Sequence, residues 1–79
     1  MEIQIDHHTL ERAEERGTNE NEIIDVINTG FSIPAKYRRI GRAKIYDFKQ
    51  RRVEVFYIIE KDTIVTVTVY VFYGKWEEG

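Results

Sequence analysis

The sequence predicts an α+β domain, with two N-terminal helices packed on one face of a four- to five-stranded, mainly antiparallel sheet. Three observations predict it. Apolar residues follow a helical period over roughly residues 7–29 and a strand-like period of two after residue 43. Residues 63–73 are almost entirely β-branched or aromatic, without a breaker, which is typical of a long central strand. Helices followed by a run of strands are the pattern of a two-layer sandwich.

The totals fit one small domain spanning residues 1–79. The chain is 42% hydrophobic and 33% charged, which is typical of a globular protein rather than a disordered one. It has no cysteine, so disulfides and thiolate metal sites are excluded. No apolar run approaches the roughly 20 residues of a membrane helix, and the N-terminus lacks the features of a signal peptide. We therefore expect a cytoplasmic protein with no membrane partner.

The N-terminal elements carry recognisable start and stop signals. Residues 2–5 alternate polar and apolar, which predicts a short edge strand. Asp6 is a good N-cap for a helix over residues 7–16, and Gly17 is a typical stop. Asn19, with Glu22 three residues later, predicts the start of a second helix that ends near Gly30. We assign no chemistry to this amphipathic second helix.

The C-terminal half is predicted to be a meander of strands. Pro34 prevents a helix after residues 31–33, and a basic connection over residues 36–42 leads into a strand near residues 43–49. Further strands are expected over residues 52–59 and 63–73, followed by a polar tail over residues 75–79. In the last strand, alternation predicts one aliphatic face that packs against the helices and one mixed face. The aliphatic face would hold Val65, Val67, Val69 and Val71.

Charge is distributed unevenly along the chain. The net charge of −2 hides a strongly acidic N-terminal half, with −6 over residues 1–35, and a basic block, with +7 over residues 36–52. Such a block attracts polyanions such as nucleic acid. Equally, charged edge strands protect a sheet from aggregation. The sequence leaves both interpretations open.

The predicted first helix has an unusual inner face. On a helical wheel, Glu11, Glu14 and Glu15 form an acidic stripe that includes His7. The opposite face, which should turn toward the sheet, carries Arg12 and Arg16 beside Thr9 and Ala13. A buried guanidinium without a partner costs several kcal/mol. We therefore expect both arginines to be partly buried and bonded to carboxylate or backbone oxygen, either as a staple to the sheet or in an open cleft.

The two histidines differ in their chemical prospects. His8 lies in the first turn, where the helix N-terminus favours the neutral imidazole that a general base requires. His7 lies on the acidic stripe and has no such role. No set of ligands converges on a metal, and the sequence has no glycine-rich phosphate loop and no cysteine nucleophile. We expect neither a metal nor another cofactor.

The first-helix residues form a motif: Asp6-x-His8-Thr9-x-x-Arg12-x-x-Glu15-Arg16-Gly17. It resembles the opening of the domain-of-unknown-function family forty-two fifty-eight, Ser-x-His-Ala-x-x-Arg-x-x-x-Arg-Gly. That family closes on a strand ending near Thr-x-Tyr, matched here by Thr68-Val69-Tyr70. The resemblance covers nearly the whole chain and departs from the motif at Asp6 and Thr9.

The resemblance implies a RelE/ParE-like sandwich and a metal-independent endoribonuclease of a toxin–antitoxin type system. By analogy, His8 transfers protons, while Arg12 and Arg16 hold the phosphate. Tyr70 donates to or orients the scissile group, supported by Thr68. RNA and a cognate antitoxin are the implied partners. The residues expected to contact RNA are Lys36, Tyr37, Arg38, Arg39, Arg42, Lys44, Arg51 and Arg52, with Tyr37 and Tyr46 available for base stacking.

The alternative is a non-catalytic domain of the same fold that binds RNA or a protein. One geometric point favours it. If the helices cover the valine face of the last strand, Thr68 and Tyr70 point away from them, and His8 reaches their hydroxyls only from the end of the sheet. Binding of an antitoxin along an edge strand is compatible with either interpretation.

Overall fold

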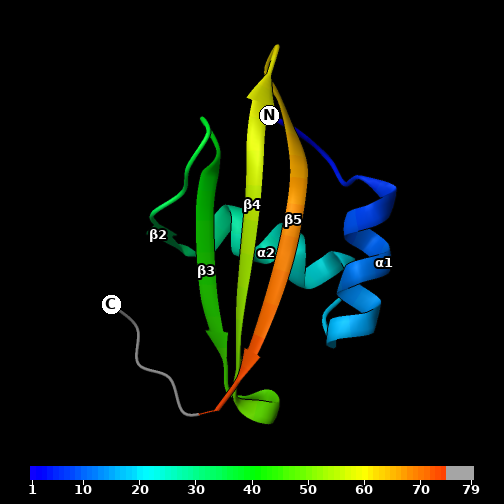
Figure 1. The fold of residues 1–79 in the computed structure, drawn as a ribbon, viewed down its shortest axis with the longest axis vertical. Helices are drawn as coiled ribbons and strands as arrows, with labels where there is room; N and C mark the ends of the chain where they lie inside the picture. The colour runs from blue at the N-terminus through cyan, green and yellow to red at the C-terminus, as the bar shows by residue number, and fades with distance from the viewer. Residues whose placement is uncertain (75–79) are drawn as a thin grey trace.

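The computed structural model describes residues 1–74, apart from the side chain of Phe48, and the predicted polar tail lies outside this range. It confirms the α+β class, with N-terminal helices that pack on a five-stranded sheet (Figure 1). The elements are β1 (Glu2–Gln4), α1 (His7–Arg16), α2 (Glu20–Thr29), β2 (Phe31–Ile33), β3 (Ile40–Tyr46), the short 3-10 helix η1 (Phe48–Gln50), β4 (Arg51–Glu60) and β5 (Thr63–Tyr73). Neither α1 nor α2 is long and apolar enough to cross a membrane.

The sheet is a meander with one added parallel strand. Its order is β1-β5-β4-β3-β2, with antiparallel pairing throughout except between β1 and β5. The third strand begins at Ile40, earlier than predicted, so part of the basic connection belongs to β3. β1 pairs only with residues 63–65 of β5, which leaves the rest of that flank to α1.

Both helices have the predicted caps. The Asp6 carboxylate accepts a hydrogen bond from the His8 backbone N–H, and Gly17 ends α1 in the left-handed conformation with φ of 92°. The Asn19 side chain accepts from the Glu22 backbone N–H, 2.9 Å away. α1 then lies along β5, whereas α2 packs across β3 and β4 (Figure 1).

A single apolar core lies between the helices and the sheet. The helices contribute small and branched side chains that fit closely against the pleated strands. Its buried members are Ala13, Ile23, Val26, Ile27, Val53, Val55, Tyr57 and Val69.

A β-bulge limits the predicted valine face of β5 to Val69 and Val71. Tyr57 lies opposite Thr66 and Phe56 lies opposite Thr68, so Val67 is an extra residue without a partner of its own in β4. One inserted residue reverses the alternation of side chains beyond it. Thr66 therefore belongs to the helix side of the sheet, where it is buried, and Val69 takes that side after the bulge. The Thr66 hydroxyl accepts a hydrogen bond from the Asp6 backbone N–H, 2.9 Å away, which ties the start of α1 to β5.

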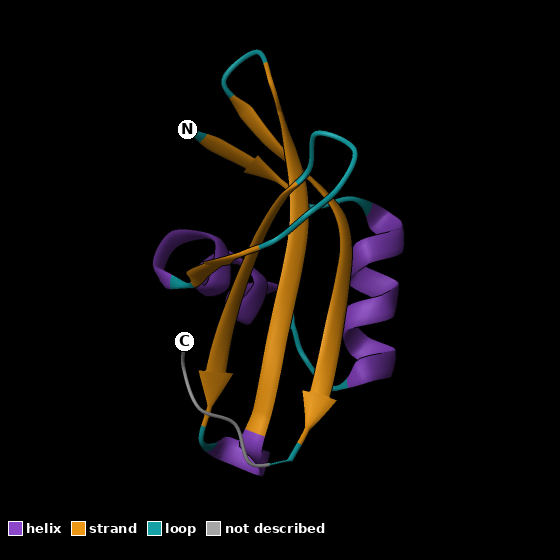
Figure 2. Cartoon of the chain, turned by 60° about the vertical axis from the view of Figure 1, so that its left-hand side comes forward, coloured by secondary structure: helices purple, strands orange, loops and turns teal. Residues whose placement is uncertain are grey.

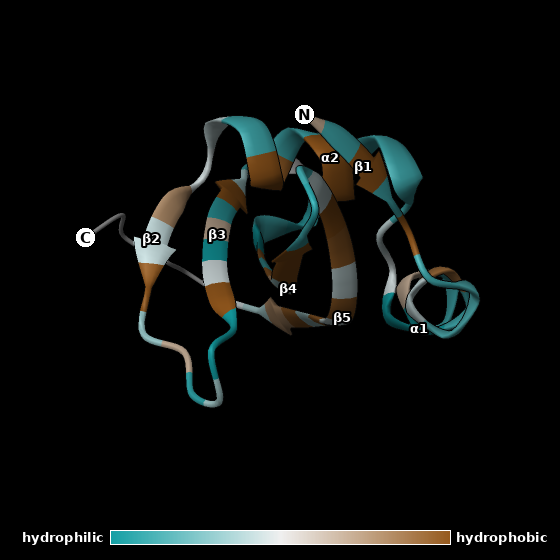
Figure 3. Ribbon diagram, turned by 90° about the horizontal axis from the view of Figure 1, so that it is seen from above, coloured by the Kyte–Doolittle hydropathy of each residue, from teal (hydrophilic) through white to brown (hydrophobic). Residues whose placement is uncertain are grey.

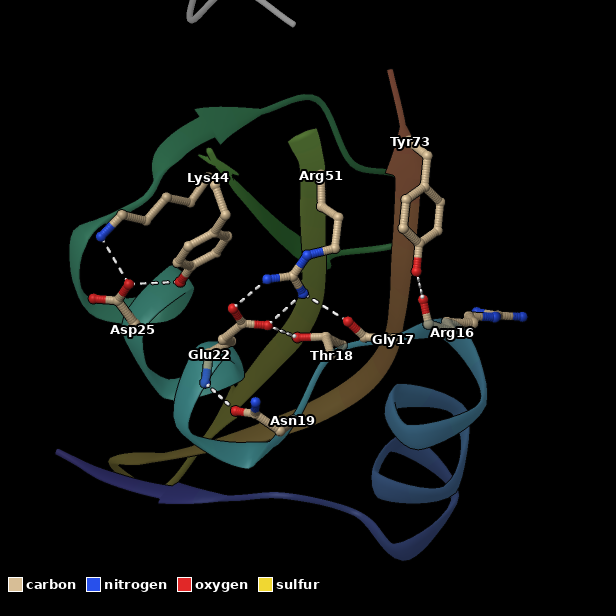
Figure 4. Close-up of polar contacts among 10 residues, drawn as sticks. Arg16, Gly17, Thr18, Asn19, Glu22, Asp25, Lys44, Arg51 and Tyr73 are labelled. Carbon is tan, nitrogen blue, oxygen red and sulfur yellow. Dashed lines mark hydrogen bonds and ion pairs between the residues drawn. The ribbon is translucent and has the colours of Figure 1, made fainter. Parts of the chain in front are cut away.

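Polar contacts fix α2 to the sheet (Figure 4). Arg51 is buried, at 4% exposure, and its guanidinium donates to both carboxylate oxygens of Glu22, 2.7 Å away, and to the Gly17 carbonyl at 2.6 Å. The hydrogen bonds from Arg51 lower the pKa of Glu22. Nearby, Asp25 accepts from the Lys44 ammonium at 2.7 Å and from the Tyr46 hydroxyl. Burial and the Asp25 hydrogen bond raise the pKa of Tyr46.

Acid should destabilise the protein through these carboxylates. The hydrogen bonds from Lys44 and Tyr46 lower the pKa of Asp25 from 3.8 to about 2, and the pKa of Glu22 is lowered from 4.5. A lowered pKa adds stability that is complete above the ordinary pKa and is lost as pH falls toward the folded-state value. We expect the urea midpoint to drop progressively between about pH 5 and about pH 2. In Asp25→Asn the drop should be smaller, and an equal drop in both proteins would contradict this role for Asp25.

Candidate nucleic-acid interface

α1 lies beside the sheet rather than over it, and this position determines what its side chains reach. Thr9 and Ala13 are buried against the sheet, on the side of the helix that faces β5. His8, Arg12 and Arg16 are spaced four residues apart, so they form a row along one side of the helix. Seen from above, α1 lies next to β5 at the edge of the sheet, while α2 covers one face of the sheet (Figure 3). The row can therefore reach the sheet face that α2 does not cover.

A cavity of about 320 Å³, here called the α1 pocket, lies between α1 and β5. It is lined by His8, Thr9, Arg12, Arg16, Val67, Thr68 and Tyr70. All five residues that the motif singled out as catalytic thus line one cavity. Thr68 and Tyr70 do point away from α2, as expected, but α1 reaches them around the edge of the sheet. The separation anticipated from the sequence does not arise, because α1 flanks β5.

Arg16 makes several contacts with β5 in this pocket. Its guanidinium donates a hydrogen bond to the Val69 carbonyl, and its Cζ lies 5.1 Å from the centre of the Tyr70 ring. The Tyr73 hydroxyl donates to the Arg16 carbonyl, 2.8 Å away (Figure 4). The expectation of a half-buried arginine bonded to backbone oxygen is confirmed for Arg16.

For Arg12 the same expectation is wrong. Its side chain is exposed, and among residues 1–74 no hydrogen bond or ion pair engages it. The helical wheel placed Arg12 against a sheet assumed to cover that whole face. Beyond the short pairing with β1, however, β5 is the last strand of the sheet, and Arg12 extends past it. Arg12 therefore offers its charge at the mouth of the α1 pocket.

The histidines also separate. The His8 side chain is 83% exposed at the rim of the pocket, with Nδ1 4.0 Å from the Glu11 carboxylate. His7 Nε2 lies 2.9 Å from Glu11 and does not line the pocket. Deeper in the wall, the Thr9 hydroxyl is buried with no hydrogen-bond partner in the described part of the chain. The pocket thus has an imidazole at its rim and an unpaired hydroxyl in its wall.

A second cavity, here called the loop pocket, lies on the same sheet face. The segment 34–39 between β2 and β3 crosses in front of the sheet (Figure 2) and borders an open cavity of about 350 Å³. Its lining is Pro34, Ala35, Lys36, Tyr37, Arg39, Phe56, Thr68 and Tyr70. Thr68 and Tyr70 line both cavities, so the two pockets are neighbours. Among the residues that the structure describes, no carboxylate lines either pocket.

The basic block divides between the two faces of the sheet. Lys36, Tyr37 and Arg39 line the loop pocket, and Arg38 is exposed at the tip of the same loop. Arg52 lies on this face too, paired with Glu54 at 2.8 Å and with its Cζ 5.3 Å from the Phe31 ring. The pockets therefore have a basic rim on the side of the loop.

The remaining members of the block belong to the α2 side. Arg42 donates to the Gly30 carbonyl, and Lys44 to Asp25. Arg51, which the sequence predicted to contact RNA, is buried against Glu22. Tyr46, expected to be free for base stacking, is bonded to Asp25 on the same side. The reason is strand alternation, which sends every second residue of the block toward α2.

Sequence reasoning also missed residues that matter here. Phe56 forms part of the loop pocket and meets Tyr70 edge-on, with ring centres 5.9 Å apart. The sequence feature that could have indicated Phe56 is strand alternation. It places this aromatic side chain on the face of β4 opposite the valines, next to the mixed face of β5. Glu22, read only as part of a helix start, is the partner of Arg51. No local pattern distinguishes that role.

The site has to be interpreted from its own geometry. No family model, curated protein or solved structure matches the chain. The resemblance to the domain-of-unknown-function family therefore remains a prediction.

Proposed function

We propose that this protein is a metal-independent endoribonuclease that binds single-stranded RNA on the sheet face between α1 and the 34–39 loop. The observation that carries the proposal is the α1 pocket. It brings an imidazole, two guanidinium groups and three hydroxyls from α1 and β5 together, and its lining within residues 1–74 includes no carboxylate. Cationic donors without competing carboxylates suit a phosphodiester.

Each side chain has a role in such a reaction. His8 takes the proton of the ribose 2′-hydroxyl, and the 2′-oxygen attacks the adjacent phosphorus. Arg12 and Arg16 stabilise the added negative charge on the phosphoryl oxygens. The bond from phosphorus to the 5′-oxygen breaks, and the Tyr70 hydroxyl, supported by Thr68, donates a proton to that leaving oxygen. The products are a 2′,3′-cyclic phosphate and a free 5′-hydroxyl.

Arg16 is the better prepared of the two arginines. Its contacts with Val69 and the Tyr70 ring fix its position before any substrate arrives. A cation that is already in position requires little free energy of reorganisation when the transition state forms. Arg12, which is exposed, would acquire its partner only when a phosphate binds.

The proposed activity is tested by incubating RNA with the purified, folded protein in the presence of EDTA. Cleavage that survives the chelator and leaves cyclic-phosphate ends supports the proposal. RNA that stays intact across several single-stranded substrates contradicts catalysis. It would instead support the second candidate, a non-catalytic RNA-binding domain.

A specific observation favours this second candidate. The exposed His8 has Nδ1 4.0 Å from the Glu11 carboxylate, and no hydrogen bond within residues 1–74 orients its ring. General bases in enzymes are usually positioned by a third group. The basic loop and the exposed Arg12 would serve RNA binding equally well without catalysis.

Arg12→Ala should weaken RNA binding without changing stability. The side chain is exposed, so the denaturation midpoint should shift by less than the equivalent of about 0.5 kcal/mol. Losing one phosphate contact should lower affinity and reduce the slope of log K against log salt by about one. Anisotropy titrations at several salt concentrations measure both quantities. Arg42→Ala, on the opposite face, is the matched control. An equal loss of affinity in the two variants would remove the α1 pocket from the interface.

A further inference from the structure

We infer that the loop pocket binds an unpaired nucleobase of the RNA whose phosphate occupies the α1 pocket. This inference rests on the proposed function and adds to it a subsite for the base. Single-stranded RNA would then be the substrate class, because a base must leave its pairing partner and its stack before it can enter a pocket on the protein surface.

The chemistry of the lining fits a base. Phe56, Tyr70 and Tyr37 provide aromatic surface, and Pro34 and Ala35 add apolar contact. Aromatic rings are the usual stacking partners of unpaired bases. The cavity of about 350 Å³ lies within the range of small-molecule sites.

The two pockets stand in the right relation for one nucleotide. Thr68 and Tyr70 line both, so a phosphate in one cavity lies directly next to the contents of the other. Arg16 lies against the Tyr70 ring from the α1 side, while Phe56 meets that ring edge-on within the loop pocket. Tyr70 would thus lie between the phosphate and the base, and its hydroxyl could contact the phosphate.

Charge around the pockets favours an RNA strand over an apolar ligand. Lys36 and Arg39 line the loop pocket, and Arg12 and Arg16 line the α1 pocket. The aromatic surface therefore has cations on both sides of it, as a base with a phosphate on either side requires. A purely apolar ligand would place no negative charge near these four cations.

The conformation of the loop also points to Tyr37. Tyr37 and Arg38 have φ of 58° and 62°, and the Arg39 backbone N–H donates to the Lys36 carbonyl at 3.2 Å. Two positive φ values define a type I′ turn, which favours Asn or Gly over bulky residues. A tyrosine in that position carries strain that a glycine would relieve. The Tyr37 ring, 83% exposed, contributes little burial in return.

The positive φ of Tyr37 makes it possible to test binding of the base without loss of stability. Tyr37→Gly removes the ring and suits the backbone, so its melting temperature should equal or exceed that of the parent. Lys61→Gly is the matched control, since Lys61 occupies the first position of the turn between β4 and β5 with φ of 47°. Phe56→Leu is a second variant, which removes a ring from the pocket while nearly preserving volume.

The experiment compares two probes by fluorescence anisotropy. One is a short oligouridylate with 2′-O-methyl riboses, which cannot be cleaved, and the other is the same backbone with every base absent. The parent should bind the first more tightly by about tenfold, the typical effect of stacking one base. Tyr37→Gly and Phe56→Leu should each lose most of this difference, and Lys61→Gly should keep it.

The outcomes separate the base subsite from the proposed function. If the parent binds both probes equally, the base subsite is overturned while binding of the RNA backbone stands. If it binds neither, the proposed function falls, and the base subsite with it. A base preference that survives in both Tyr37→Gly and Phe56→Leu overturns the placement in the loop pocket.

Discussion

Replacing His8 by alanine is expected to lower the rate of RNA cleavage by about 10²–10⁴-fold, the usual contribution of a general acid–base group. His7→Ala is expected to leave the rate unchanged. The physical reason is position. His8 lies at the rim of the α1 pocket beside Arg12 and Tyr70, whereas His7 is engaged by Glu11 outside it. The two variants remove the same side chain from adjacent positions of one helix, so each controls for the other.

The measurement is the initial cleavage rate of a single-stranded RNA in EDTA, with identification of the product ends. Both side chains are more than 80% exposed, at 81% for His7 and 83% for His8, so neither substitution should change the thermal unfolding curve. Binding of the uncleavable 2′-O-methyl probe should also be retained by His8→Ala. Equal rates for the two variants would remove His8 from the chemistry. Equal loss of probe binding and cleavage in His8→Ala would make it a binding residue.

Glu22→Ala is expected to be the most destabilising of the substitutions considered. It leaves the Arg51 guanidinium buried without its carboxylate, and breaking a buried pair in this way typically costs about 3–5 kcal/mol. The Thr18 hydroxyl loses its partner at the same time. Domains are stable by only about 5–15 kcal/mol, so the variant should lose a large fraction of the free energy of unfolding. Urea denaturation followed by circular dichroism gives the free energy of unfolding.

The matched control is Glu20→Ala in the same helical turn. Both substitutions remove a carboxylate that interacts favourably with the helix N-terminus, a contribution of about 0.3–1 kcal/mol. Glu20 is exposed, so the difference in stability between the two variants reports the bonds that Glu22 makes with Arg51 and Thr18. The double variant Glu22→Ala/Arg51→Met should recover part of the loss, because it leaves no buried charge. Equal stability of Glu22→Ala and Glu20→Ala would show that the ion pair between Glu22 and Arg51 contributes no more than a surface interaction.

The same ion pair is connected to the candidate site. Arg51 donates to the Gly17 carbonyl at the end of α1 as well as to Glu22 at the start of α2. The joint between the helices is thereby fixed to β4 (Figure 4). Loss of the pair should therefore loosen the end of α1 that carries Arg16, and RNA cleavage should fall with stability.

Local features were predictable from the sequence by itself. The limits of α1 and α2 follow from Asp6, Gly17 and Asn19, whose caps form within a few residues of chain. β5 was predicted over its full length because β-branched and aromatic residues strongly favour strands and this run of them is unbroken. The row of His8, Arg12 and Arg16 is a consequence of helical spacing alone. All of these depend on interactions between near neighbours in the chain.

Only the tertiary structure decided how these elements meet. The bulge at Val67 depends on how β5 pairs with β4, and it changes which side chains of the long strand face the helices. Arg51 and Arg52 are adjacent in one basic block, yet pleating buries the first against Glu22 and turns the second to the opposite face. The position of α1 beside β5, which unites His8 with Tyr70, depends on contacts such as the one from Asp6 to Thr66, which are distant in sequence. Distant partners of this kind leave no periodic signal in the sequence. Many residues in the chain have similar chemistry, and only folding decides which of them come into contact.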